Sequence, residues 1–241
     1  IRHFTQTPSR CCFSLIGYKD ALFCSVLSHS WTCRVFQRKA LIVLFQHWFG
    51  AAAEEASVSS TVSLYLREVR SAAPALLAFM VNLADDNSNT ALHYSVSHCN
   101  YDIVGLLLDT GVVDVNIQNN AGYTAVMLAS LTAPDGPAGT EVVRRLMELG
   151  SINVQSKQTG QTALHLAARH GRGVMVRLLL SFGADANIQD ERGTTALMFA
   201  SGRGHTHIAR LLLERSQCDP TLSDKVELLR VVSPELQISL G

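Results

Sequence analysis

The sequence predicts an all-α fold in which short helical units stack into an elongated solenoid. One four-residue phrase, Thr-Ala followed by Leu or Val and then by His or Met, recurs along the chain. The copies begin at Thr90, Thr124, Thr162 and Thr195, so successive copies lie 34, 38 and 33 residues apart. Self-similarity at such a period indicates a stacked repeat, because one unit cannot bury its apolar helix faces without its neighbours.

Each unit has the same order of elements. A polar turn comes first, the phrase then starts a short inner helix, and an outer helix dense in Leu and Val follows. Gly122, Gly160 and Gly193 take the fourth place of the turn, where a positive φ is expected. Ser88 stands there in the first unit and predicts a strained or altered turn. The phrase and the period resemble the ankyrin repeat, so we expect an ankyrin-repeat solenoid with β-hairpin tips.

The regions outside the repeats differ in composition. Residues 1–40 mix Cys, Ser, Phe and Trp without a sustained period and are predicted to lack an independent fold. Residues 41–81 are expected to form a helical N-terminal cap, with Ser59-Ser60 capping one helix and a second helix from Pro74 to Val81. The array at 82–224 is expected to hold repeats at 82–114, 115–152, 153–185 and 186–220, with an atypical tail at 225–241.

The second unit is about five residues longer than the others between its two helices. The segment Thr132–Thr140 is dense in Pro and Gly, which oppose helix continuation, and it is therefore predicted to be a surface loop.

Composition disfavours several classes of function. The 20 basic and 20 acidic side chains balance, and no basic stripe is visible, which argues against nucleic-acid binding. No apolar run approaches the roughly 18 residues that a membrane-spanning helix needs. Four of the six cysteines fall in the first 33 residues, which is not the distribution of a secreted disulfide framework, so a reducing, cytosolic setting is expected.

No catalytic, metal or cofactor site is predicted, and the chain is not expected to be an enzyme. His93 and His165 lie inside the phrase, where a ring bonded to the backbone of the adjacent hairpin is favoured over a catalytic role. Cys99 stands where other units have Gly after the inner helix and is interpreted as a turn residue. The N-terminal cysteines match no zinc template; they are Cys11, Cys12, Cys24 and Cys33.

Longer strings resemble one family, the KANK proteins (kidney ankyrin repeat-containing proteins). The resemblance covers about three quarters of the chain, from about His47 to Asp224. The strings that carry it are Val81–Asp85 with Asn89–His98, Gln118-Asn119 with Ala121–Thr124, Gly160–Leu164, and Gly183–Asp185 with Asn187–Asp190.

The resemblance implies a cytoplasmic adaptor at the cell cortex that takes part in actin regulation. Its C-terminal ankyrin domain would bind a segment of a kinesin-4 motor and so connect to microtubules. The talin-binding motif and the coiled coil of that family have no counterpart in this sequence, so only the ankyrin-borne part of the role is implied. Separately, the chain is expected to be a monomer. A fifth repeat is expected after Asp219–Asp224 and is replaced by other sequence, so Ile208, Leu211 and Leu212 are predicted to be exposed.

The expected binding surface is the concave face made by hairpin tips and the exposed side of the inner helices. Tyr123 and Leu131 stand out, because apolar side chains at surface positions have no core duty. Packing of Tyr123 beside the next hairpin is the alternative. The candidates are Asp86, Asn87, Asn89, Ser97 and His98 in the first unit, Asn120, Tyr123, Leu131 and Thr132 in the second, and Lys157, Gln158, Gln161, Arg169, His170, Glu191, Arg192 and Arg203 in the third and fourth.

Two other functions remain open at this point. The N-terminal cysteines would support a redox or enzymatic role if their segment were ordered and the thiols reactive. Alternatively, the chain is a truncated ankyrin protein with weak or no binding.

Overall fold

The structure is a computed structural model that describes residues 31–132, 134 and 136–224. Its described part consists of helices joined by loops, with a single isolated β-bridge between Ala84 and Thr90. The helices are α2 (Trp31–Ala52), α3 (Ser59–Ala72), α4 (Pro74–Val81), α5 (Ala91–Ser97), α6 (Tyr101–Leu108), α7 (Ala125–Thr132), α8 (Gly136–Leu149), α9 (Ala163–Arg169), α10 (Gly173–Ser181), α11 (Ala196–Gly202) and α12 (Thr206–Arg215).

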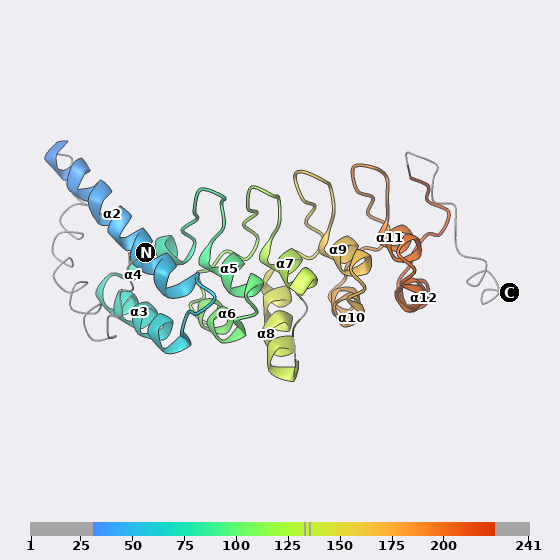
Figure 1. The fold of residues 1–241 in the computed structure, drawn as a ribbon, viewed down its shortest axis with the longest axis horizontal. Helices are drawn as coiled ribbons and strands as arrows, with labels where there is room; N and C mark the ends of the chain where they lie inside the picture. Colours follow the sequence, from blue (N-terminus) through green and yellow to red (C-terminus); the bar gives the residue numbers. More distant parts are fainter. Residues whose placement is uncertain (1–30, 133, 135, 225–241) are drawn as a thin grey trace.

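The repeats stack side by side, as the periodicity predicts. The inner helices α5, α7, α9 and α11 form one row, the outer helices α6, α8, α10 and α12 form a second, and the hairpin loops project from the inner row (Figure 1). One core runs through the array; its fully buried members include Leu92, Met127, Leu164 and Ile208. The predicted all-α solenoid is therefore confirmed.

The N-terminal cap consists of α2, α3 and α4. Trp48 of α2 is fully buried, and α2 packs against both α3 and α5. Helix α2 begins at Trp31, ten residues before the boundary at 41 that the sequence predicts, while residues 1–30 lie outside the described residues. Helix α4 has the predicted bounds, with Pro74 in its first turn. The expected serine cap of α3 is wrong, because the N-cap residue is Val58 and no side chain caps the helix.

The predicted surface loop of the second repeat is shorter than expected. Helix α8 begins at Gly136, so residues 136–140 are helical despite their Pro and Gly. Pro137 is compatible with helix there because it sits in the first turn, where its missing N–H costs no hydrogen bond. Gly139 lies against the ring of Tyr101, and a Cβ on it would stand 3.0 Å from Tyr101 Cδ2.

Asparagine side chains tie each repeat to the next. Asn82 Nδ2 donates to Val112 O at 2.8 Å while its Oδ1 accepts from Asp114 N at 2.7 Å. Asn153 and Asn187 lie at the equivalent positions of later units, and each makes the same pair of bonds to the unit that follows it. Asn116 supplies the acceptor half, to Ser151 N at 2.7 Å. Because each side-chain amide bonds the backbone of the next unit, these bonds help to hold neighbouring repeats at a fixed spacing.

The end of the described array continues the same pattern. Asn187 bonds Gln217 O and Asp219 N, and Gln189 Nε2 donates to Ser223 O at 3.0 Å. The prediction that Ile208 and Leu212 are exposed is wrong, because both are fully buried. These two side chains pack among the apolar residues of the core, and helix α12 rests on α10 and α11.

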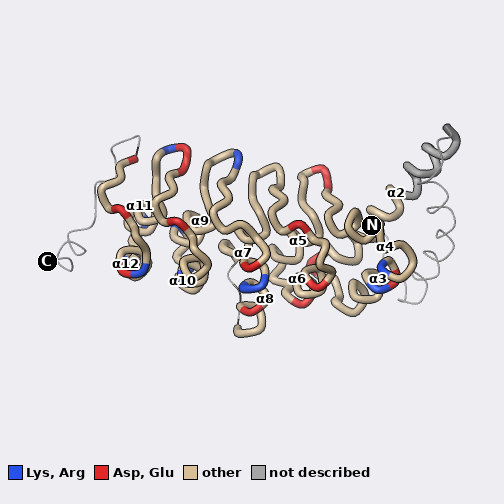
Figure 2. Tube along the Cα trace, turned by 180° about the vertical axis from the view of Figure 1, so that it is seen from behind, with Lys and Arg blue, Asp and Glu red and all other residues tan. Residues whose placement is uncertain are grey.

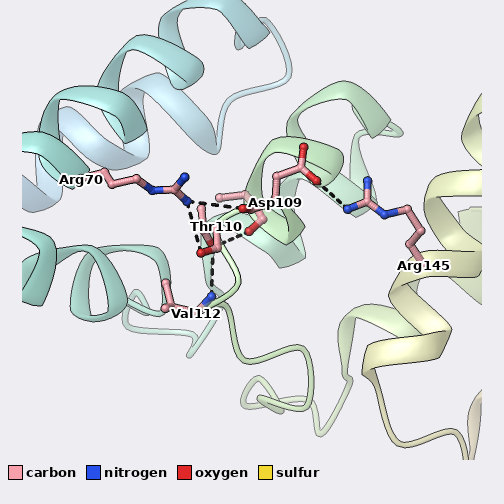
Figure 3. A network of polar contacts seen from close by, with 6 residues as sticks. Arg70, Asp109, Thr110, Val112 and Arg145 are labelled. Carbon is pink, nitrogen blue, oxygen red and sulfur yellow. Dashed lines mark hydrogen bonds and ion pairs between the residues drawn. The ribbon is translucent and has the colours of Figure 1, made fainter.

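A polar network connects the cap to the first two repeats along the outer helices (Figure 3). Arg70 of α3 donates to Thr110 O at 3.2 Å and to Asp109 O at 3.4 Å, both just beyond the end of α6. Arg145 of α8 forms an ion pair with the Asp109 carboxylate at 2.5 Å. These groups are largely solvated, so each contact contributes well under about 1 kcal/mol and mainly fixes relative positions.

The hairpin turns bring neighbouring repeats into backbone contact. Gly160 has φ +68°, and a Cβ on it would stand 2.9 Å from Glu191 N. Gly183 has φ +81°, but a Cβ there would meet no atom within 4 Å. Of these two glycines, only Gly160 combines a positive φ with a close approach of a neighbouring backbone.

We therefore expect Gly160→Ala to destabilise the fold more than Gly183→Ala. Both substitutions place a Cβ in the left-handed region, at roughly 1–2 kcal/mol each, and Gly160→Ala adds a clash with a neighbouring backbone, at roughly 1–3 kcal/mol. Urea unfolding of the two variants and the parent chain measures the difference. Equal losses would show that the hairpins are not held as closely as described.

Candidate protein-interaction surface

The hairpin tips form a hydrogen-bonded ladder. Asn120 N donates to Asn87 O at 2.9 Å, and Asn120 Nδ2 donates to Asp86 O at 2.9 Å. Gln158 Nε2 donates in turn to Asn120 O. Several residues predicted to contact a partner therefore also hold the tips in register, and the tips are a positioned surface instead of independent loops.

The turn geometry agrees with the sequence. Gly122, Gly160 and Gly193 all have positive φ. Ser88 has φ +59° at the equivalent place, which confirms the predicted strain there. Cys99 has φ +57° after the first inner helix, as a turn residue should.

The two histidines of the phrase bridge neighbouring repeats as predicted. Thr90 N donates to His93 Nδ1 at 3.1 Å, so this ring nitrogen is an acceptor and Nε2 carries the proton. His93 Nε2 then donates to Tyr123 O of the next hairpin at 3.1 Å. His165 makes the same contacts with Thr162 and with Thr194 O. Each histidine therefore caps the N-terminus of its own helix and also bonds the backbone of the following repeat.

Burial shifts the titration of both rings. It is the largest cause that lowers the pKa of His93 and of His165 below the ordinary value of 6.5, and it outweighs the backbone hydrogen bonds that act to raise it. Protonation would also remove the acceptor that Nδ1 offers to the threonine backbone. The buried rings therefore remain neutral near neutral pH.

The predicted contact residues divide by exposure. Gln161 is buried and its amide donates to the Asp190 carboxylate at 3.3 Å, so its side chain does not form part of the surface. The half-buried candidates are Asn89, Tyr123, Leu131, Thr132 and Arg169. The exposed candidates are Asp86, Asn87, Ser97, His98, Asn120, Lys157, Gln158, His170, Glu191, Arg192 and Arg203.

Tyr123 and Leu131 are each half-buried and pack against the core. The Tyr123 carbonyl accepts the His93 ring bond, and the Leu131 carbonyl accepts Arg172 Nε at 3.2 Å. Their backbones therefore serve the stack, while part of each side chain remains accessible. Tyr123 thus packs against the core, as one prediction has it, and also keeps an accessible part that could contact a partner, as the other has it.

A row of apolar side chains was missed by the sequence reasoning. The fourth residue after the phrase threonine is Tyr94, Leu128, Leu166 and Phe199 in the four repeats. Leu166 is buried, whereas the other three are half-buried. Since these residues share one slot of the inner helix, aligning the repeats position by position would have found them. The three half-buried members, Tyr94, Leu128 and Phe199, belong to the candidate surface.

The aromatic contacts continue from the first repeat onto the cap. Tyr94 lies edge-on to Phe49 of α2, with ring centroids 6.2 Å apart, and Phe49 stacks on Phe45 at 4.4 Å. The Tyr94 hydroxyl donates to Asp85 Oδ2 at 2.6 Å, and this bond is the largest cause that raises the Tyr94 pKa. The cap and the first hairpin thus share one aromatic cluster.

The other candidate chemistries gain no support from the described residues. No group of three His, Cys, Asp or Glu side chains there could hold a metal ion. Cys218 is half-buried, and burial raises its pKa to about 11, so it is a thiol at neutral pH. Cys11, Cys12 and Cys24 lie outside the described residues, as does the side chain of Cys33. None of the described helices is both long and apolar enough to cross a bilayer.

The stacked helix pairs, projecting hairpins and partly exposed inner row define a repeat solenoid of the protein-binding class. A family model described as ankyrin repeats (3 copies) matches residues 51–150 and 131–224. The chain therefore belongs to the ankyrin repeat family, whose members act as protein–protein interaction modules.

Individual relatives agree with this assignment. The Notch homolog protein 1 of Cricetulus griseus and that of Mus musculus are each 38% identical over 95 residues, which are 34% of this chain and 4% of those proteins. The chain thus spans only a small part of these relatives. The crystal structure of the ankyrin repeat domain of Bcl-3, a member of the IκB family, matches with a TM-score of 0.59 and 25% identity, over 84% of this chain and 91% of that one.

The buried histidines predict an acid-sensitive fold. Above pH about 6.5 both rings are neutral in the folded and the unfolded chain, so they add no pH dependence. As the pH falls below that value, the unfolded chain takes up protons that the folded chain resists. Stability should therefore fall toward the lowered folded-state pKa, by up to roughly 1.4 kcal/mol per pH unit for each ring.

A double variant, His93→Met with His165→Met, should flatten this acid dependence. Met127 and Met198 occupy the same place in the other two repeats, so the chain itself shows that Met fits there. Urea midpoints between about pH 7 and about pH 5 measure the slope. His98→Gln, at an exposed histidine, is the control that should leave the slope unchanged. An equally steep slope in the double variant would contradict the assignment.

Proposed function

We propose that the concave face of this array captures a short segment of a partner protein, in the manner of a cytoskeletal adaptor. The observation that carries this proposal is the set of half-buried apolar side chains on and near the inner helices, above all Leu128 and Leu131 of α7 and Tyr123 just before that helix. Apolar side chains on a rigid, hydrogen-bonded surface are suitable anchors for a peptide, because little ordering entropy is lost on the receptor side.

The partner that we propose is a linker segment of a kinesin-4 motor, at the cell cortex in the cytoplasm. The support for this partner is the resemblance of the repeat strings to the KANK family. The resembling strings include the hairpins and inner helices that form the proposed binding face. The competing proposal is an ankyrin array with weak or no binding. It predicts a folded chain that leaves the peptide free.

Titration of a fluorescently labelled kinesin-4 linker peptide with the full chain distinguishes the two. The full chain is used because α2 packs against α5 and belongs to the folded unit. Circular dichroism of the same sample checks that the protein is helical. Saturable binding supports the adaptor role, and a folded chain that does not bind contradicts the kinesin-4 assignment.

Tyr123→Ala and Leu131→Ala should each weaken this binding about five- to thirty-fold, since truncating a central anchor costs roughly 1–2 kcal/mol. Leu149→Ala is the matched control, because Leu149 is 58% exposed at the end of the outer helix α8. It should bind as the parent chain does. If the helical content is intact and Tyr123→Ala binds equally well, Tyr123 serves packing alone and the site is wrongly placed.

A further inference from the structure

Three arginines and two histidines gather where the inner helices of the third and fourth repeats end. Arg169 is the last residue of α9 and His170 its C-cap, and Arg203 is the C-cap of α11. Arg172 and His205 are the N-cap residues of the outer helices that follow. We call this set the cationic cluster; its members are Arg169, His170, Arg172, Arg203 and His205.

The cluster arises from the repeat register. His170 and Arg203 occupy the same slot of consecutive repeats, and so do Arg172 and His205. Stacking therefore places like residues beside one another, and His205 Nε2 lies 3.3 Å from the Arg169 carbonyl oxygen. The first repeat has His98 and Asn100 in these slots, so the arginines are confined to the C-terminal half of the array.

The members of the cluster act on one another as like charges. The pKa of His170 is lowered first by partial desolvation of its accessible ring and then by Arg169, Arg172, Arg203 and His205, so the charges that shift it are all positive. The ion pairs of Arg67, Arg144 and Arg145 lie on cap or outer helices instead. A negatively charged ligand would relieve this repulsion.

Charge also changes along the hairpin tips. The tip of the first repeat carries Asp85 and Asp86, the second is uncharged, the third carries Lys157, and the fourth carries Asp190, Glu191 and Arg192 (Figure 2). A long polyanion such as nucleic acid would meet the acidic first tip. A peptide with carboxylates at one end only fits with that end over the cationic cluster, at the ends of the inner helices α9 and α11.

We propose that the cationic cluster binds a pair of carboxylates on an acidic protein segment and so fixes the direction in which the segment lies on the array. This inference deepens the proposed function and depends on a peptide-binding concave face. Inner helices of neighbouring repeats lie roughly 8–10 Å apart, and seven residues of a helical peptide span about 10.5 Å. Two glutamates spaced i, i+7 on the segment would therefore reach the third and fourth repeats together.

The test uses two fluorescein-labelled helical peptides of identical sequence, with leucines on one face and either Glu or Gln at one i, i+7 pair. The full chain should bind the Glu peptide about ten-fold more tightly than the Gln peptide, because two partly solvated charge pairs together supply that factor. Added salt should reduce the difference, since both pairs are solvent-accessible. The ring proton signals of His170 should shift only with the Glu peptide.

The variant Arg169→Gln with Arg203→Gln should bind both peptides equally. Arg177→Gln with Arg210→Gln is the matched control, because it removes the same charge from exposed positions on the outer helices of the same repeats. The control should keep the preference for Glu. Circular dichroism confirms that both variants fold.

Two outcomes would overturn the inference about the cationic cluster without deciding whether the proposed peptide-binding function is correct. Equal, saturable binding of both peptides to the parent chain would retain a peptide-binding face and reject the cationic cluster. Binding of neither peptide would also reject the cluster, while the kinesin-4 titration and the Tyr123 and Leu131 variants still test the proposed function by themselves.

Discussion

Contact between neighbouring repeats is the constraint on which this structure depends. A unit of two short helices has too little interior to bury its own apolar side chains, and the core of this chain is instead shared from Trp48 in the cap to Leu212 in the last outer helix. Polar groups follow the same logic. Asn82, Asn153 and Asn187 each satisfy a donor and an acceptor of the next unit, so backbone groups that a lone unit would leave open are paired by its neighbour.

The positions of the repeat divide into those that hold the stack together and those that are free to vary. Thr90 and His93 bond to each other around the start of α5, and His93 also bonds to the next hairpin. Residues in those slots are committed to stacking. The remaining positions, such as that of Leu131, can differ between repeats without loss of the stack, and they supply apolar and charged groups to the face made by the hairpin tips and inner helices.

The electrostatic character of the face also follows from register. A residue at a given position of one repeat lies beside the residues at the same position of the adjacent repeats. Basic residues at that position in two neighbouring repeats therefore form a patch, whereas a single one does not. His170 and Arg203 show this directly. The chain as a whole is neutral, with 20 basic and 20 acidic side chains, yet basic side chains gather at the ends of the inner helices of the third and fourth repeats. Net charge is therefore a poor guide to the chemistry of a repeat surface.

The sequence by itself determined the repeat, its period, and the roles of residues whose neighbours are local or fixed by the period. The helix at Pro74–Val81, the positive φ of Ser88 and the histidine bridges belong here, because the slot of each residue in the repeat prescribes its surroundings. Tertiary structure alone decided which sides of the helices are covered. Ile208 is buried although no further unit follows in the described chain, Gln161 is turned inward to Asp190, and the start of α8 includes residues that read as a loop. The physical reason is that burial depends on the side from which a neighbour packs, and a one-dimensional pattern of apolar and polar residues does not record that direction.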